Sequence, residues 1–588
     1  MCGVFGYVGQ PTDVGGTILT ALKTLEYRGY DSWGLALSTP GDVMVHKDVG
    51  RINGTVRSYP SSTLGIGHTR WATHGGVEVA NSHPHLDCSR RIAVVHNGII
   101  ENHAQLRKQL LLRGHRLESK TDSDVVAHLV EEELAAGSDL GHAVGTVFGL
   151  LDGYNAVVVM DRLGQQFAAA KRVSPLVLGR GARGSTIASD AIALNDHADE
   201  LIYLEDDQLA ILDAQSVAVF DRSSMRRVSP VAVSHQIDKA GNGLAGYPDF
   251  LSKEIAEQPA ALRRLILGGR DEIESLADAI STAESVIVVG CGTAGNAALA
   301  GTYLFDQICS RLVTMIPASE FRHRSRTLNA GSLVIALSQS GETVDVLDAM
   351  AVAKRAGARL ATIVNTPMST LDRTVETRVL LRAGVEQCVL ATKSYTTMLA
   401  TLLLAAHALD LRWSTGADLV LRAADSIESM LVDGSRDRVK AIATRLASAQ
   451  NLFVIGRGAH YPSALEAALK IKEVSYIHAE GFAAGELKHG VIALVEPGTP
   501  CVILAPQDSS RTDVLSGAAE LKSRGGHIIG VGSTSDGVFD EFIEIPDAGL
   551  ANIIVEAVPG QLLGYFAALA RGNDPDRPRN LAKSVTVK

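Results

Sequence analysis

The second residue of the chain is a cysteine, and it carries the first chemistry that the sequence offers. Once Met1 is removed, Cys2 has a thiol and a free α-amine on one residue. An α-amine of pKa roughly 7.7–8.0 can accept the proton of a thiol of pKa about 8.5 near neutral pH. Cys2 is therefore a candidate nucleophile with its own base, which still needs an oxyanion hole and groups that bind a substrate.

Three other segments of the N-terminal part supply such groups. Arg70, among small and hydroxyl residues, can bind a carboxylate through two hydrogen bonds. Asn97 and Gly98 follow an apolar run, where the amide and the Gly N–H can stabilise an oxyanion. Asp122 precedes an apolar helix and can pair with an ammonium group. Together with Cys2, they suit an amino acid with a side-chain amide, and glutamine is the obvious one.

Each segment also has a structural interpretation. Arg70 would form a surface ion pair, Asn97-Gly98 a hairpin turn, and residues 121–124 the N-cap of a helix. For each segment taken singly, this interpretation is the stronger one, and only the combination favours an amidase site.

A second chemical pattern is the apolar run from Leu333 that leads into Ser-Gln-Ser-Gly-Glu-Thr at 338–343 and a helical pattern. Hydroxyls and N–H groups at a helix start bind phosphate, because the unpaired donors and the helix dipole both favour an anion. Such a sequence also forms ordinary helix caps, but its place after an apolar strand favours phosphate binding. The predicted phosphate ligands are Thr293, Ser338, Gln339, Ser340 and Thr343.

A helical pattern at 463–474 places Lys470 and Glu473 on neighbouring surface, because they are three residues apart. With Glu466 they would also make an ordinary salt-bridge ladder. On spacing alone, the ladder is the stronger interpretation.

The elements that position these residues differ between the two halves of the chain. In the N-terminal part, short apolar runs predict strands, for instance at 91–96 and 156–160, and helical spacing predicts helices at 14–26 and 101–113. The C-terminal part alternates strands with long Ala- and Leu-rich helices, which predicts parallel sheets. Two stretches there align, 286–298 with 452–464 and Gln339 with Gln507, so a single α/β domain is duplicated. The predicted division is an N-terminal domain (2–235), a linker (236–250), two α/β domains (251–425 and 426–577) and a tail (578–588).

Composition limits the partners. With 588 residues, 46% hydrophobic and 20% charged, the chain is globular, and its net charge of −10 argues against a nucleic acid or an anionic membrane as a partner. The six cysteines are scattered without a C-x-x-C pair, so neither a zinc site nor disulfides are predicted. Without a targeting or membrane segment, we expect a cytoplasmic protein.

Several longer motifs resemble one known family. They are Cys-Gly-x-x-Gly at the N-terminus, Tyr-Arg-Gly-Tyr-Asp-Ser at 27–32, His-Thr-Arg-Trp-Ala-Thr-His-Gly at 68–75 and His-Asn-Gly-Ile-Ile-Glu-Asn at 96–102. They are similar to class II, N-terminal-nucleophile glutamine amidotransferases, and within that class to the isomerising glutamine–fructose-6-phosphate aminotransferases. The resemblance runs through Pro-Arg-Asn-Leu-Ala-Lys-Ser-Val-Thr-Val at 578–587. It implies an α+β domain, an αββα sandwich, followed by two α/β sugar isomerase (SIS) domains with parallel sheets.

For the N-terminal domain, the resemblance implies a nucleophile at Cys2 and an oxyanion hole at Asn97 and Gly98. It further implies that Arg70 and Asp122 bind glutamine and that Thr73 and His74 line its pocket. Trp71 would gate the ammonia path.

For the C-terminal half, the resemblance implies that Glu473 is the isomerisation base, assisted by Lys470. His489 matches a ring-opening histidine that a neighbouring subunit supplies, which implies a homodimer. Lys583 matches a lysine that forms an imine with the ketone, and Ala582 would border the ammonia channel. The resemblance implies that glutamine and fructose 6-phosphate give glutamate and glucosamine 6-phosphate, with no cofactor and no metal.

Two positions depart from the family pattern. Ala294 and Ala391 stand where the family usually has serine, which removes two hydroxyls from the sugar-phosphate pocket. One lost hydrogen bond to a charged group costs about 1.5–3 kcal/mol, or roughly ten- to a hundredfold in affinity. Two alternatives therefore stay open: amination of a different ketose phosphate, and a sugar-phosphate sensor without turnover. Trp33 is also larger than the residue usual there, and no role is assigned to it.

Overall fold

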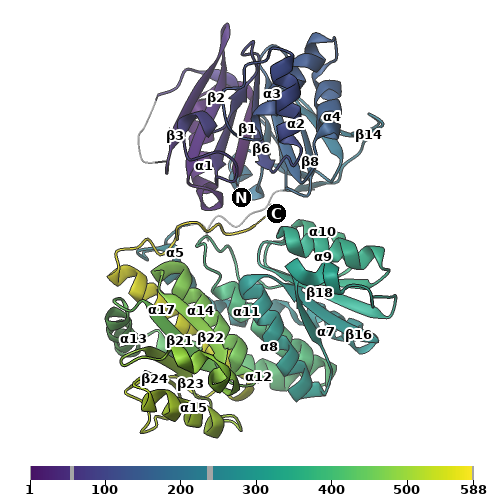
Figure 1. The fold of residues 1–588 in the computed structure, drawn as a ribbon. Coiled ribbons are helices and arrows are strands. Elements are labelled where there is room, and N and C mark those ends of the chain that lie inside the picture. Colours follow the sequence, from purple (N-terminus) through teal and green to yellow (C-terminus); the bar gives the residue numbers. More distant parts are fainter. Residues whose placement is uncertain (1, 53–57, 235–242, 586–588) are drawn as a thin grey trace. The chain divides into compact units, whose positions relative to one another are not determined.

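The computed structural model describes residues 2–52, 58–234 and 243–585 (Figure 1). The chain divides into two compact units, Met1–Lys239 with Ala582–Lys588, and Ala240–Leu581. Of the predicted linker, residues 236–242 lie outside the described ranges, as do residues 586–588 of the predicted tail.

The N-terminal unit is built on two antiparallel sheets, ordered β15-β11-β9-β10-β1-β4-β2-β3 and β14-β13-β12-β8-β7-β6-β5. Its helices and strands are β1 (Gly3–Thr12), α1 (Val14–Thr24), β2 (Ser32–Thr39), β3 (Asp42–Val49), β4 (Ser62–Arg70), β5 (His85–Leu86), β6 (Ile92–Gly98), α2 (His103–Leu112), α3 (Asp124–Ala135), α4 (Leu140–Leu150), β7 (Asn155–Asp161), β8 (Gln166–Arg172), β9 (Val177–Gly181), β10 (Gly184–Ala188), β11 (Glu200–Tyr203), β12 (Gln208–Leu212), β13 (Val217–Asp221), β14 (Arg227–Val228) and β15 (Ala232–Ser234).

The alternation of side chains along the strands creates the layers of this unit. In β6, Ala93 and Val95 pack into the core between the two sheets, whereas Ile92 and Val94 pack against α2, α3 and α4. Because successive side chains of a strand point to opposite faces, both faces of the sheet are covered. On the other sheet, α1 covers the outer face. The predicted αββα sandwich is confirmed, as are the helices predicted at 14–26 and 101–113 and the strands predicted at 91–96 and 156–160.

The C-terminal unit contains two five-stranded parallel sheets, ordered β17-β16-β18-β19-β20 and β22-β21-β23-β24-β25. Both sheets follow the same strand order, which confirms the duplicated α/β domain. The helices and strands are α5 (Phe250–Ala256), α6 (Gln258–Gly268), α7 (Arg270–Ser281), β16 (Ser285–Gly290), α8 (Gly292–Cys309), β17 (Thr314–Pro317), β18 (Ser332–Ser338), α9 (Val344–Arg355), β19 (Arg359–Val364), α10 (Thr370–Thr374), β20 (Thr377–Leu380), α11 (Lys393–Leu409), α12 (Trp413–Met430), α13 (Asp433–Leu446), β21 (Asn451–Gly456), α14 (His460–Ser475), β22 (His478–Ala483), β23 (Pro500–Leu504), α15 (Arg511–Ser523), β24 (His527–Gly532), β25 (Glu541–Glu544), α16 (Asn552–Val555) and α17 (Ala557–Ala570).

The two repeats share one apolar core. Helices α8 and α11 of the first repeat and α14 and α17 of the second contribute side chains to it (Figure 1). Helix α12 runs across the predicted boundary at 425/426. Among the described helices, the segment Gly549–Ala570 is apolar enough over 22 residues to cross a membrane, but 89% of its most apolar window is buried inside the protein, as in a core helix.

A buried histidine joins three segments of the second repeat. His460, the first residue of α14, lies 2.8 Å through Nδ1 from Glu556 Oε2 and 3.0 Å through Nε2 from Asp508 Oδ2. Burial opposes its positive charge, but the two carboxylates outweigh burial and raise the pKa of His460 to about 10. The same contact with His460 lowers the pKa of Asp508. The ion triad therefore fixes the loop after β23 and the start of α17 to α14.

This triad gives stability a defined pH dependence. Because the pKa of His460 is raised on folding to about 10, its stabilising effect is fully present below the unfolded pKa of about 6.5 and is lost as pH rises through about 10. We expect the difference in unfolding free energy between the parent and His460→Gln to shrink by about 1.4 kcal/mol per pH unit over that window. Urea unfolding across the window measures it, and a difference that stays constant with pH would contradict the assignment.

Candidate functional site

Cys2 lies directly before β1, beside the end of β4. The backbone N–H of Trp71 donates to Cys2 Sγ at 3.3 Å, and Sγ lies 3.7 Å from the Trp71 carbonyl oxygen. Desolvation raises the pKa of the Cys2 thiol, although the Trp71 N–H and the charge of Arg70 act in the opposite direction. A thiol in this environment needs a nearby base to become a nucleophile. A free α-amine on the same residue would act as that base.

The Asn97 amide is aimed at Cys2. Its Nδ2 donates to the Cys2 carbonyl oxygen at 2.8 Å, and its Oδ1 lies 3.1 Å from Nε2 of His68. Burial lowers the pKa of His68 to about 3, so its ring is neutral, and a proton on Nε2 fixes which end of the amide faces Cys2. Asn97 and Gly98 are the last residues of β6 and pair with β7, so the hairpin-turn interpretation is wrong. Gly98 has φ +139°, where other residues would be strained.

Arg70 ends β4 and is buried rather than placed in a surface ion pair. Its guanidinium donates to three backbone carbonyl oxygens, those of His74 at 2.5 Å and of Gly75 and Gly76 at 3.1 Å. These bonds order the loop of the predicted pocket residues, in which Thr73 is exposed and Trp71 and His74 are half-buried.

Asp122 is buried, and its Oδ2 accepts the backbone N–H of Ile100 at 2.8 Å. Its neighbour Ser123 lies 2.8 Å through Oγ from Nδ1 of His96 and makes no side-chain cap bond to α3. The N-cap interpretation is therefore not realised. The charges of Cys2 and Asp122 both act on Arg70, so these groups lie within electrostatic reach of one another.

Two residues of this site were not predicted. Asp31 accepts the backbone N–H of Ala72 through Oδ2 at 2.8 Å, and His68 orients Asn97. Both lie inside motifs that the sequence already singled out, and their position in those motifs was the available signal. Trp33 is buried in β2 against the ring of His46, and nothing in the structure assigns it a functional role.

In the first SIS repeat, residues 338–343 connect β18 to α9. Ser338 Oγ accepts the N–H of Gly341 at 3.0 Å and lies 3.2 Å from Thr343 Oγ1, while Ser340 Oγ accepts the N–H of Glu342 at 3.2 Å. The Gln339 carbonyl accepts the N–H groups of the 365–366 segment, both at 3.2 Å. The loop leads into the N-terminus of a 12-residue helix, where no side chain caps the first turn. Its geometry suits an anion.

Strand order places this loop where open parallel sheets bind ligands. In the order β17-β16-β18, the connections from β16 and β18 leave toward opposite sides of the sheet, so a crevice forms at their carboxyl ends. Thr293 follows β16 and the 338–343 loop follows β18, so both lie at this switch point.

The second repeat has the same strand order but not the same loop chemistry. Asp508 follows Gln507, which aligns with Gln339, and therefore stands where the first repeat has Ser340. Its carboxylate accepts the N–H of Ser510 at 2.8 Å and pairs with His460. A carboxylate already occupies the anion position there, which favours the first repeat as the phosphate site.

The predicted Lys470–Glu473 pair is present, but it is not part of a surface ladder. Lys470 Nζ lies 2.7 Å from Glu473 Oε2 and 3.4 Å from Glu466 Oε1, and both Lys470 and Glu466 are buried. Burial alone would lower the pKa of Lys470, but the two carboxylates raise it above its ordinary value. The ladder interpretation is therefore wrong, and α14 carries a buried cation beside the predicted base.

Thr293 connects this cluster to the first repeat. Its hydroxyl donates to Glu466 Oε1 at 3.0 Å and accepts from Lys470 Nζ at 3.0 Å. Asn296 Nδ2 donates to the other Glu466 oxygen at 2.8 Å. The side chain of Thr293 is thus engaged by α14, and its role as a phosphate ligand stays a prediction.

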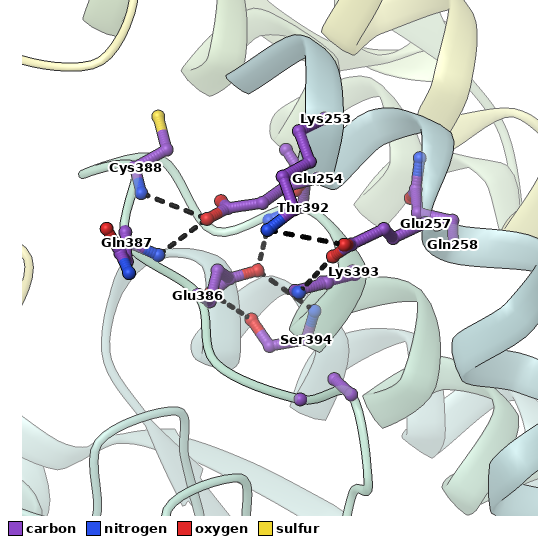
Figure 2. Close-up of polar contacts among 12 residues, drawn as sticks. Lys253, Glu254, Glu257, Gln258, Glu386, Gln387, Cys388, Thr392, Lys393 and Ser394 are labelled. Carbon is purple, nitrogen blue, oxygen red and sulfur yellow. Dashed lines mark hydrogen bonds and ion pairs between the residues drawn. The ribbon is translucent and has the colours of Figure 1, made fainter. Parts of the chain in front are cut away.

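Figure 2 shows how the buried Glu386 and Glu254 hold the loop between Glu386 and Ser394. Ala391 belongs to this loop by its place in the sequence. Glu386 accepts the N–H groups of Thr392 and Ser394 at 3.0 and 3.1 Å, at the start of α11. Nζ of Lys393 donates to Glu257 at 2.5 Å. None of these bonds uses the side chain at 391, so the alanine there changes the surface of the loop and not its conformation.

Three predicted residues lie apart from these clusters in the sequence. His489 is exposed at the end of a short turn, Ala484–His489, after β22. Ala582 and Lys583 are half-buried in the tail. Their catalytic roles stay predictions.

The buried ion cluster predicts a large effect of one substitution. Lys470→Met removes the cation between Glu466 and Glu473, and we expect it to lower the unfolding free energy by about 3–5 kcal/mol, because a buried carboxylate is left uncompensated. Lys472→Met, an exposed position on the same helix, serves as the control and should change stability by less than about 0.5 kcal/mol. Urea unfolding at neutral pH measures both. An equal loss of unfolding free energy in the two variants would show that the ion pairs of Lys470 do not stabilise the fold.

Known protein families match segments in both units of the chain. The SIS domain family matches residues 279–408 and 445–541, and the glutamine amidotransferase domain family matches residues 68–196. Isomerising glutamine–fructose-6-phosphate aminotransferases from Thermococcus kodakarensis, Pyrococcus horikoshii and Streptomyces coelicolor are 39%, 40% and 40% identical, each over 100% of both chains. A solved structure, the C-terminal domain of glucosamine-fructose-6-phosphate aminotransferase from Francisella tularensis, is 31% identical with a TM-score of 0.52, over 57% of this chain and 99% of that one. The chain therefore belongs to the family of isomerising glutamine–fructose-6-phosphate aminotransferases.

Proposed function

We propose that the chain converts fructose 6-phosphate and glutamine to glucosamine 6-phosphate and glutamate. The observation that carries this proposal is the full-length match to the aminotransferases, which covers both units of the chain. The geometry supports it. One unit directs the Asn97 amide at the carbonyl oxygen of Cys2, and the other contains the 338–343 loop, whose geometry suits an anion, and a buried lysine paired with Glu473.

Ammonia is released at Cys2. With Met1 removed, the thiol loses its proton to the α-amine, and the sulfur attacks the side-chain carboxamide of glutamine. Asn97 Nδ2 and the Gly98 N–H stabilise the oxyanion, and collapse of the tetrahedral intermediate expels ammonia and leaves a thioester on Cys2. Water then releases glutamate. Arg70 and Asp122 bind the α-carboxylate and the α-amine of glutamine, and Thr73 and His74 line the pocket.

The ammonia then reaches the SIS half, past Trp71 and Ala582. There the phosphate of the sugar binds at 338–343, and His489 of a neighbouring subunit opens the ring. Lys583 forms an imine with the C2 ketone and is displaced by ammonia.

Glu473 moves the proton from C1 to C2 and so completes the aldose. The Lys470 ammonium, 2.7 Å from Glu473, stabilises the ionised carboxylate that accepts this proton. The mechanism implies a cytoplasmic homodimer and needs neither a nucleic-acid nor a membrane partner.

The nucleophile is tested by Cys2→Ala. We expect this variant to release no glutamate from glutamine, with or without fructose 6-phosphate, because no other residue takes over the thioester step. Cys309→Ala, a half-buried cysteine on α8, is the matched control and should keep the parent rate. Glutamate release by Cys2→Ala would refute the N-terminal assignment, and a parent that makes no glucosamine 6-phosphate would refute the acceptor.

A second candidate is amination of a different ketose phosphate, which Ala294 and Ala391 favour. If fructose 6-phosphate is the acceptor, Ala391→Ser and Ala294→Ser should each restore a hydroxyl and lower its KM by about tenfold. Steady-state kinetics with several ketose phosphates measures this. The second candidate would be favoured if the parent prefers another ketose phosphate and if serine at either position lowers its activity with that sugar.

A further inference from the structure

Four potential metal ligands converge in the N-terminal unit, outside the residues assigned to the glutamine site. Cys88 lies in the turn between β5 and β6, and His115 follows α2, while His128 and Glu131 lie one turn apart on α3. Their ligand atoms all lie within 4.8 Å of one another. No short motif joins them, because three separate segments supply them, and for that reason the sequence predicted no metal site.

Four of the six distances between these atoms suit a tetrahedron around a small ion. Cys88 Sγ lies 3.6 Å from His115 Nδ1 and 3.5 Å from His128 Nδ1. Glu131 Oε2 lies 3.2 Å from the first of these nitrogens and 3.5 Å from the second. Tetrahedral zinc with bonds of about 2.3 Å to sulfur and about 2.0–2.2 Å to nitrogen and oxygen separates its ligands by roughly 3.3–3.6 Å.

A carboxylate outside the four ligands orients the imidazole ring of His115. His115 Nε2 lies 3.1 Å from Glu132 Oε1. His128 is buried, and its Nε2, which makes no hydrogen bond, lies 4.0 Å from Asp124 Oδ1. Metal-binding histidines usually direct the second ring nitrogen at a carboxylate, as His115 does here, which leaves the first nitrogen free to bind the ion.

A cation would account for one of the two proton arrangements that this cluster allows. With a proton on each Nε2, the lone pairs of both Nδ1 atoms face the sulfur of Cys88 and the carboxylate of Glu131. Four electron-rich atoms at such distances repel one another, and the single thiol proton can serve only one pair. The alternative, protons on both Nδ1 atoms, gives an ordinary hydrogen-bonded cluster that holds no metal.

We propose that Cys88, His115, His128 and Glu131 bind one zinc ion. The thiolate and the carboxylate neutralise the two charges of the ion, and two neutral imidazoles complete the soft and borderline ligand set that zinc prefers. Four protein ligands leave no open position, so the ion is structural and not catalytic. The site does not depend on the reaction proposed above.

The ion would brace the segments that carry the glutamine site. It ties the turn before β6 to α3, and β6 carries Asn97 next to its last residue, while α3 begins directly after Asp122 and Ser123. Ser123 already contacts His96 of β6 at 2.8 Å. Zinc therefore adds a second connection between the strand of the oxyanion amide and the helix that follows the ammonium-binding carboxylate.

Metal content tests the site directly. The full chain, supplied with zinc and then dialysed against metal-free buffer, should retain about one zinc per chain by mass spectrometry. Retention should fall at least about tenfold in Cys88→Ser and in Glu131→Gln. His142→Ala, an exposed histidine of the same domain that contacts Asp139, is the matched control and should retain zinc.

Cobalt substitution keeps the test independent of folding defects in the variants. In the parent, Co²⁺ should give the intense visible bands of a tetrahedral site and a thiolate-to-metal charge-transfer band, which Cys88→Ser abolishes. A chelator should lower the melting temperature of the parent but not that of Cys88→Ser. A parent that retains no zinc after dialysis, or a cobalt spectrum without the thiolate band, would overturn the proposal.

Discussion

The buried ammonium of Lys470 is the interaction on which the C-terminal half depends. Two carboxylates flank it, and Thr293 of the first repeat bonds both to it and to Glu466. A buried ion is tolerated only when its partners are complete, so the cluster fixes how α8 and α14 pack against each other. The same contacts join α8 of the first repeat to α14, the helix that carries the predicted base Glu473.

In the N-terminal unit, contacts to the backbone hold the predicted site residues in place. Arg70, Asn97 and Asp122 each hold a main-chain group, from a loop, from Cys2 and from Ile100 respectively. The side chains predicted to bind substrate are thereby held in place without it, which lowers the entropy that ordering them would cost during a reaction.

The features that the sequence predicted lie in continuous stretches of the chain. The strand at 91–96 followed from local patterning and the duplicated sheet from the repeat of residues 286–298 at 452–464, whereas the layers of the N-terminal unit followed from the family resemblance. Cys2, Asn97 and the 338–343 loop were singled out by the chemistry of their residues and by motif, and their roles stay predictions. What escaped prediction were contacts between distant segments, such as Thr293 with Glu466, because tertiary packing and not local spacing brings such side chains together.

The carboxylate of Asp508 has a consequence for how much sugar the chain can hold. A duplicated domain starts with two equivalent anion sites, and a second site without a base beside it would sequester substrate unproductively. A fixed negative charge at that loop repels a phosphate dianion, and the imidazolium of His460 holds the Asp508 carboxylate in place. Because the corresponding loop of the second repeat carries this carboxylate, saturation of the chain by a sugar phosphate should follow a single-site isotherm.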